Sequence, residues 1–155
     1  MSHTVSVDLS AKVEQWSKNT AIVFSNEICG SILVSKKVKK QARDWSKIRY
    51  PKQQQAFYQY VLFAAFIYLL VRPYVPRIRH LAIDLDYPGE HSIRRIKDFL
   101  LEMLRRDQPG LRGTFISFRE VKGTQADKLA RHIFEQQKPA DRRIHLNEVQ
   151  TIFGQ

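Results

Sequence analysis

The chain has 155 residues, of which 43% are hydrophobic and 11% aromatic, so the composition excludes intrinsic disorder, and the length fits one domain over residues 1–155. Its formal net charge of +11 at pH 7 favours a polyanionic partner, with nucleic acid first and an anionic membrane surface second. The single cysteine, Cys29, excludes an internal disulfide and a thiolate zinc cluster and fits an intracellular protein, either cytoplasmic or nucleoid-associated.

The first part of the chain alternates short apolar segments with polar turns, which is typical of an antiparallel meander. Residues 4–9 alternate apolar and polar side chains, and this pattern predicts a strand with Asp8 on its polar face near the carboxyl end. Residues 20–24 and 31–34 are rich in β-forming residues and predict a second and a third strand.

A basic helix is predicted to follow the third strand. Ser35 is a suitable N-cap for a helix that begins at Lys36 and buries Val38, Ala42 and Trp45. Its other faces carry many more bases than acids, which fits a phosphate-binding surface as well as an ordinary solvated face. The candidate nucleic-acid-binding residues in this helix are Lys36, Lys37, Lys39, Lys40 and Arg43.

The next helix is strongly apolar. Pro51 suits its first turn, and its end falls at about Val71. Residues 61–71 form a run of eleven apolar residues, fewer than the roughly 20 that a membrane span needs. The run therefore predicts a buried core helix and no membrane span, with a homodimer interface over residues 57–71 as the alternative.

Residues 81–85 predict a strand that carries two acids. Asp84 and Asp86 are two residues apart, so their side chains leave the same face of the strand before Pro88 and Gly89 end it. Two buried carboxylates are costly unless positive charge compensates them. A divalent cation is one source of that charge, and the lysines and arginines of the chain are the other.

The remaining segments predict a helix capped by Ser92, a strand over residues 114–118, a helix over residues 124–134 and a short closing helix capped by Asn147. Because the acid-bearing strand leads into a helix, it fits a parallel α/β unit. The chain is therefore expected to form an α/β fold with a mixed five-stranded sheet, in which a three-strand antiparallel meander is joined by parallel strands and flanked by helices.

Three acids occupy distinct places in this order of elements: Asp8 near the end of the first strand, Asp84 at the end of the fourth, and Asp127 at the start of the last long helix. Over residues 4–134 the arrangement resembles the ribonuclease H-like superfamily, which includes ribonuclease H and the Holliday-junction resolvases. Asp8-Leu9-Ser10 is similar to the D-x-S motif of an uncharacterised branch. Residues 125–130 (QADKLA) are similar to its Q-x-A-D-x-x-A motif, although Gln and Ala are contiguous here.

The resemblance implies that the first and fourth strands lie side by side and parallel, with their acids meeting at the carboxyl ends. It also implies Mg²⁺ or Mn²⁺ held by Asp8, Asp84 and Asp127. Because Asp86 shares the strand face of Asp84, it is a candidate fourth catalytic acid, or the replacement for Asp84 if the strand is displaced by two residues. Hard oxygen ligands of this kind suit two ions about 4 Å apart in phosphodiester hydrolysis. The sequence departs from the superfamily pattern in one helix. The helix after the third strand usually supplies a glutamate in that superfamily, whereas here its one acid is Asp44.

The acids and the positive charge together favour a metal-dependent nuclease or resolvase-like phosphodiester hydrolase that acts on nucleic acid, DNA or RNA, with Lys122 and Lys128 as further phosphate-binding candidates. The first alternative is a non-catalytic nucleic-acid-binding or adaptor domain with a degenerate ribonuclease H-like fold. The second is a PD-(D/E)xK-type nuclease, in which Glu120-Val121-Lys122 supplies the E-x-K and Asp84 or Asp86 supplies the upstream acid.

Overall fold

The structure is a computed structural model that describes residues 3–26, 28–85, 87, 89–120 and 125–154. Its strands are β1 (His3–Ser10), β2 (Thr20–Ser25), β3 (Gly30–Val34), β4 (Ile78–Asp84), β5 (Ile116–Arg119) and β6 (Arg142–Arg143). Its α-helices are α1 (Lys36–Arg49), α2 (Gln55–Val71), α3 (Glu90–Asp107), α4 (Gln125–Phe134) and α5 (Leu146–Phe153). Two 3₁₀ helices, Arg72–Arg77 and Gly113–Phe115, lead into β4 and β5.

The described strands form one mixed sheet in the order β5-β4-β1-β2-β3-β6. Strands β1, β2 and β3 pair antiparallel, as the predicted meander requires. Strand β4 pairs with β1 and β5 pairs with β4, both in parallel. The predicted α/β class with a mixed sheet flanked by helices is confirmed, but the sheet has six strands and not five. The additional strand, β6, consists of two exposed arginines that carry no strand signal in the sequence.

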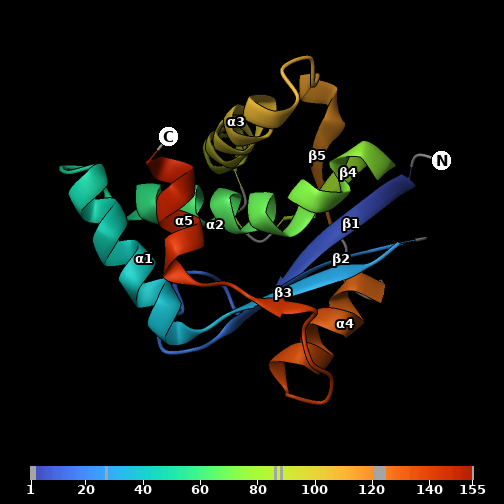
Figure 1. Cartoon of the computed structure of the whole chain (residues 1–155), viewed down its shortest axis with the longest axis horizontal. Helices are drawn as coiled ribbons and strands as arrows, with labels where there is room; N and C mark the ends of the chain where they lie inside the picture. Colours follow the sequence, from blue (N-terminus) through green and yellow to red (C-terminus); the bar gives the residue numbers. More distant parts are fainter. Residues whose placement is uncertain (1–2, 27, 86, 88, 121–124, 155) are drawn as a thin grey trace.

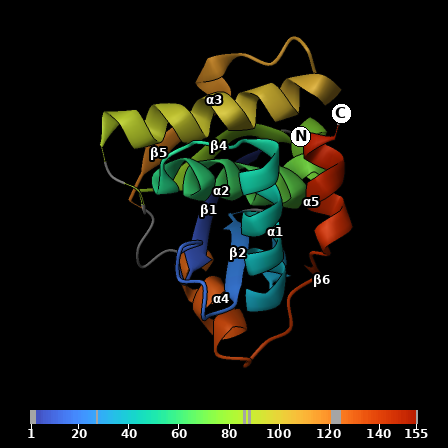
Figure 2. The same cartoon turned by 90° about the vertical axis from the view of Figure 1, so that its left-hand side faces the viewer.

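Helices cover the two faces of the sheet unequally (Figure 1). Helix α4 lies on one face, and the other helices lie on the opposite side, with α3 stacked on α2 (Figure 2). The alternation of β1 produces this arrangement, because Val5, Val7 and Leu9 enter the main core. Ser6 and Asp8, between them, leave the sheet on the α4 face.

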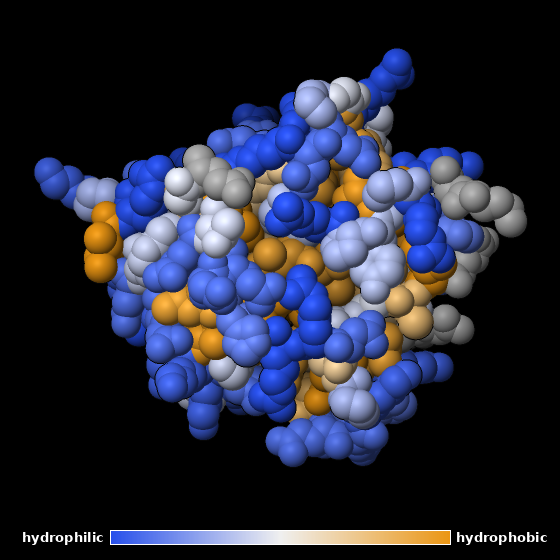
Figure 3. Space-filling view, in the orientation of Figure 1, coloured by the Kyte–Doolittle hydropathy of each residue, from blue (hydrophilic) through white to orange (hydrophobic). Residues whose placement is uncertain are grey.

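Helix α2 is the centre of the main core. Every residue from Val61 to Val71 is buried in the chain itself, so the predicted core helix is confirmed. This burial removes most of the surface that a homodimer through residues 57–71 would need. The helical segment Gln55–Arg77 is long and apolar enough to cross a membrane, but 67% of its most apolar window is buried inside the chain, as in a core helix. The surface seen in Figure 3 is mainly hydrophilic, with small separate apolar areas.

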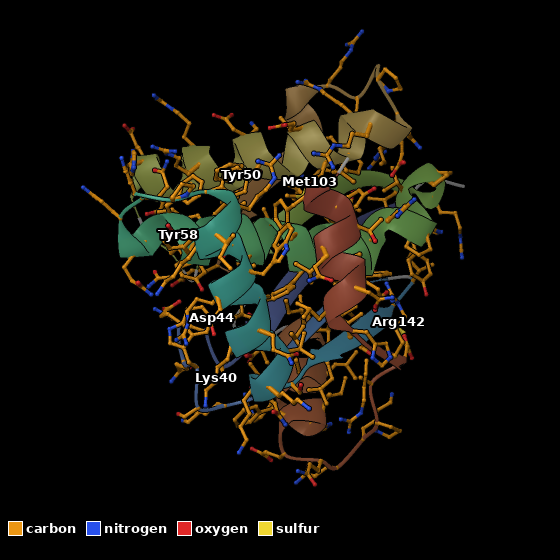
Figure 4. All side chains as sticks on the ribbon, turned by 60° about the vertical axis from the view of Figure 1, so that its left-hand side comes forward. Lys40, Asp44, Tyr50, Tyr58, Met103 and Arg142 are labelled. Atoms are coloured by element: carbon orange, nitrogen blue, oxygen red, sulfur yellow. The ribbon has the colours of Figure 1, made fainter. Side chains whose placement is uncertain are left out.

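Helix α1 begins where the sequence predicts. The Oγ atom of Ser35 accepts a hydrogen bond of 3.2 Å from the backbone N–H of Val38. The predicted stripe is largely confirmed, since Ala42 is buried and Val38 and Trp45 are partly buried against the core. Lys39 and Ser46 are buried in addition. Figure 4 shows where α1 meets α2, and there the Tyr58 hydroxyl donates a 2.7 Å hydrogen bond to the carbonyl of Tyr50.

The other predicted helix starts shift by one to four residues, and α2 begins at Gln55 and not near Pro51. Helix α3 begins at Glu90, after Gly89 with a φ of 102°, so Ser92 lies inside the first turn and not at the cap. The Ser92 hydroxyl instead hydrogen-bonds the Tyr60 hydroxyl at 2.8 Å, which joins α3 to α2. Helix α5 is capped by His145, whose backbone N–H donates to the Glu148 carboxylate at 2.8 Å, and not by Asn147.

Two isoleucines in neighbouring helices allow a matched test of the core. Ile67 of α2 has no exposed surface, whereas Ile48 of α1 is 81% exposed. Because Ile67→Ala leaves a cavity in the core, we expect it to lower the free energy of unfolding by about 2–5 kcal/mol. Ile48→Ala is expected to change it by less than about 0.5 kcal/mol. Chemical denaturation of both variants measures the difference, and equal values would contradict this position of α2.

Candidate functional site

Asp8 and Asp84 lie side by side near the carboxyl ends of two neighbouring parallel strands. Val7 of β1 is paired with Ile83 of β4, so the next residues along, Asp8 and Asp84, are opposite each other. Side chains at paired positions leave the same face of a sheet. Both residues are largely buried, with Asp8 3% and Asp84 7% exposed. The structure therefore brings together two acids that are 76 positions apart in the sequence.

Asp127 comes to the same face of the sheet on helix α4. Ala126, Ala130 and Ile133 pack against Ala21 and Val23, and α4 contacts β1 and β2. This packing holds the first turn of α4, which carries Asp127, on the face from which Asp8 projects.

The Asp127 carboxylate accepts a 3.1 Å hydrogen bond from Arg131, one turn further along α4, and its side chain is 24% exposed. Within the described ranges, no three His, Cys, Asp or Glu side chains gather in a group able to hold a metal ion. Asp8, Asp84 and Asp127 thus do not form such a group among the described residues. Asp86, the fourth predicted acid, lies outside the described residues.

Tyr87 connects the segments that follow the two acid-bearing strands. Its hydroxyl donates a 2.7 Å hydrogen bond to the Glu14 carboxylate and accepts one of 3.2 Å from the backbone N–H of Val13. The Tyr87 ring also packs against the rings of Tyr60 and Phe63 in α2. The loop after β1 is therefore held against the chain after β4, which limits relative movement of the strand ends that carry Asp8 and Asp84.

Glu14 and Asp44 differ in their relation to this pair of strands. Glu14 enters the site region through Tyr87, a long-range contact with no signal in the sequence. Asp44, the one acid of α1, is an exposed residue beside Arg43 on the opposite side of the sheet from α4. Neither is part of a three-residue metal group among the residues described.

Arg119 is a site residue that sequence reasoning missed. It ends β5 and is paired with Asp84. Its guanidinium reaches across β4 and donates a 3.4 Å hydrogen bond to Ser6 of β1. An arginine at the end of a short strand carries no special signal in the sequence. Its place beside the acids depends on the parallel pairing of β4 with β5.

The E-x-K segment can be placed only in part. Glu120 is exposed, whereas Val121 and Lys122 lie outside the described residues. Strands β4 and β5 are neighbours, but they are parallel and are connected through α3. This geometry differs from the hairpin on which a PD-(D/E)xK core normally carries its acid and its E-x-K.

Most of the predicted basic residues that the structure describes are accessible. Strand β3 runs in the same direction as β1. Helix α1, which follows β3, therefore begins at the end of the sheet where β1 and β4 have their carboxyl ends. Arg43 is partly buried, with its guanidinium 4.9 Å from the centre of the Trp16 ring. The exposed candidates are Lys36, Lys37 and Lys40 on α1, of which Lys40 is labelled in Figure 4, and Lys128 on α4. Lys122 lies outside the described residues.

Lys39 does not belong to this exposed surface, which corrects its assignment as a nucleic-acid-binding residue. Its side chain has no exposed area. The Nζ atom lies within hydrogen-bonding distance of four oxygen atoms, which share its three N–H donors. They are the Thr20 hydroxyl at 2.9 Å and three carbonyl oxygens of the loop after β1: those of Lys12 at 3.3 Å, Gln15 at 2.8 Å and Lys18 at 2.7 Å. Lys39 thus holds that loop against α1.

Comparisons of the chain with models of known protein families, with curated proteins and with solved structures found no match. The chemistry of the site therefore rests on its own residues. Those residues are two adjoining buried carboxylates, an arginine beside them and a set of accessible lysines at the same edge of the sheet.

The buried ammonium of Lys39 gives a testable pH dependence. Burial lowers the pKa of Lys39 from 10.5 to about 8, while the Glu14 carboxylate acts in the opposite direction. The unfolded chain keeps this proton up to its higher pKa, so folding releases it between these two values. This group therefore makes the folded state more stable as the pH rises through that window.

We expect the ¹³C NMR signal of the Lys39 Cε atom to titrate with a midpoint of about 8. The variant Lys39→Met identifies the signal by its loss. A midpoint at the ordinary lysine value of 10.5 would show that the ammonium is not enclosed as described.

Proposed function

We propose that this protein is a metal-dependent hydrolase of nucleic-acid phosphodiesters, a nuclease or resolvase-like enzyme with a ribonuclease H-like fold. The observation that carries the proposal is the placement of Asp8 beside Asp84 on paired parallel strands. Two adjoining carboxylates, each less than 10% exposed, are costly to bury without positive charge between or beside them.

The topology supports the fold assignment. The resemblance implies that the first and fourth strands are parallel neighbours, and β1 and β4 have that relation. It also implies an acid from the last long helix, and α4 lies over β1 with Asp127 in its first turn. These relations connect residues far apart in the chain, so they are independent of the short motifs at Asp8 and Asp127.

The donor atoms suit Mg²⁺ or Mn²⁺. Such hard cations prefer carboxylate oxygens, and Asp8 and Asp84 supply them from two rigid strands whose following segments Tyr87 connects. When bound there, the cation would lower the pKa of an attacking water and stabilise the leaving oxygen. Asp8 and Asp84 would hold the ion, and Asp127 would complete the set once its carboxylate leaves Arg131.

The positive charge supports nucleic acid as the substrate. The net charge is +11, and Lys36, Lys37 and Lys40 lie on the helix that begins at the acid-bearing edge of the sheet. Contacts of lysine with phosphates are largely independent of sequence and weaken as salt is added. These residues would hold the substrate strand while the acids act on one of its phosphodiesters.

A second candidate function is a nucleic-acid-binding or adaptor domain that does not cleave. One observation favours it, namely that Asp127 is bonded to Arg131 and that the described residues contain no three-carboxylate group. Such a protein would keep the salt-dependent binding and lack the cation-dependent reaction.

The variant Asp84→Asn separates the two functions. Loss of residues that merely orient metal ligands costs about 10–100-fold, so loss of a ligand is expected to reduce Mg²⁺- or Mn²⁺-dependent cleavage by about 100-fold or more. Binding of the same nucleic acid should be retained. Gel-based cleavage and fluorescence anisotropy, each with labelled DNA and RNA, measure the two properties.

Asp98→Asn is the matched control, because Asp98 is an exposed acid on α3, and it should cleave as the unchanged protein does. Cleavage by Asp84→Asn at the rate of the control would reject the hydrolase. No cleavage by the unchanged protein with either ion, together with salt-dependent binding, would favour the adaptor.

A further inference from the structure

Beside the acid pair, the same face of the sheet carries a row of small residues. Ser6 of β1 is paired with Ala82 of β4, which is paired with Ser117 of β5. All three side chains therefore leave the face from which Asp8 and Asp84 project. The row lies two residues before the acids along β1 and β4, which corresponds to about 6.6 Å along a strand.

Arg119 spans this row. Its guanidinium starts at the end of β5 and reaches the Ser6 hydroxyl, 3.4 Å away on the far side of β4. The methyl side chain of Ala82, between them in the sheet, is small enough to leave room for that path. Ser6 is only 8% exposed, so its hydroxyl is an enclosed polar group near the guanidinium.

His80 and Ser117 form the other end of the row. The His80 Nδ1 atom is 3.1 Å from the carbonyl oxygen of Thr114, which can only accept a hydrogen bond, so Nδ1 carries the hydrogen. The Nε2 atom is 2.7 Å from the Ser117 hydroxyl, and in the neutral imidazole it accepts a hydrogen bond from that hydroxyl. The imidazole is thus fixed by two bonds, and it fixes the Ser117 hydroxyl in turn.

Arg119 has donors left for a ligand. A guanidinium has five N–H donors in a planar fork that fits two phosphate oxygens at once. Among the described residues, Ser6 is the one hydrogen-bond partner of this guanidinium. The residue is also exposed, so an anion can approach it from solvent.

We infer that Arg119, with Ser6, Ser117 and His80 around it, is a phosphate-binding subsite next to the acid pair. Its ligand is a phosphodiester of the substrate nucleic-acid strand. This phosphodiester is the neighbour, in the same strand, of the one on which the acids act. The inference rests on the proposed function for the identity of this strand. It adds the path that the strand follows, which runs along β1 and β4. Arg119 is a substrate-positioning residue in this arrangement, since it does not touch the reacting phosphodiester.

Dimethyl phosphate is a suitable probe, because it is a phosphodiester with one fixed negative charge. We expect it to shift the NMR signals of the Arg119 side-chain N–H and of the Ser117 and Ser6 amides, with Mg²⁺ present and absent. A hydrogen bond to a charged group contributes about 1.5–3 kcal/mol, so Arg119→Gln should weaken this binding about tenfold or more. Arg119→Lys should retain part of it, because it keeps the charge and loses the fork.

The matched control is Arg112→Gln, which removes an exposed arginine from the segment before β5 and should leave the binding unchanged. The subsite would be overturned if Arg119→Gln and Arg112→Gln bound dimethyl phosphate with equal affinity. It would also be overturned if dimethyl phosphate shifted only the NMR signals of the lysines of α1. The proposed hydrolase function would be retained despite this result if Asp84→Asn still abolished cleavage. Binding that depends on Arg119 in a protein that cleaves nothing would instead retain the subsite and reject the hydrolase.

Discussion

The parallel pairing of β1 with β4 is the constraint on which the rest of the structure depends. It places two carboxylates, Asp8 and Asp84, at opposed positions in a sheet, where both are nearly removed from water. An isolated buried carboxylate is expensive, and two neighbours of like charge raise that cost. A fold that keeps such a pair has to bring positive charge or a cation to it, and this requirement makes the pair a candidate site and not merely part of the core.

The direction of the strands explains why other charged groups gather near the pair. Strands β1, β3, β4 and β5 all run the same way, so the loops that follow them leave from one edge of the sheet. Two partly buried polar contacts hold the loops at this end of the sheet: the Lys39 ammonium secures the loop after β1, and the Tyr87 hydroxyl connects that loop to the chain after β4. Both are shielded from water more than a surface ion pair is, which strengthens them.

The elements of the fold were largely predictable from local pattern. Alternation identified β1 and the polar position of Asp8, and a long apolar run identified α2 as a core helix, because side-chain periodicity follows directly from burial. Strand β6 was missed because two exposed arginines carry no strand pattern, and the contacts that hold Arg142 are all long-range or outside the strand: backbone pairing with β3, and guanidinium hydrogen bonds to Glu148 and to the Leu69 carbonyl. The cap of α3 was misplaced because Gly89, which adopts a positive φ, ends the preceding turn before Ser92 is reached.

The site was less predictable, since its contacts join residues far apart in the sequence. No local feature of the sequence distinguishes Lys39 from the other lysines of α1. In the structure, however, it is the buried lysine of that helix, and its ammonium bonds to carbonyl oxygens. Arg119 and the bond between His80 and Ser117 depend on the register of β4 with β5, which no local pattern encodes. The resemblance implied that the strands carrying Asp8 and Asp84 are neighbours, but nothing in the sequence indicated that Asp127 is bonded to Arg131.

The central claim is that Asp8 and Asp84 act together as the ligands of a divalent cation. Adding Mn²⁺ to the isotope-labelled protein tests it directly, because the paramagnetic ion broadens the NMR signals of nearby nuclei. The account predicts that the backbone amides of Leu9 and Leu85 broaden first and that the effect disappears in Asp8→Asn. Broadening centred elsewhere, or unchanged in that variant, would contradict it.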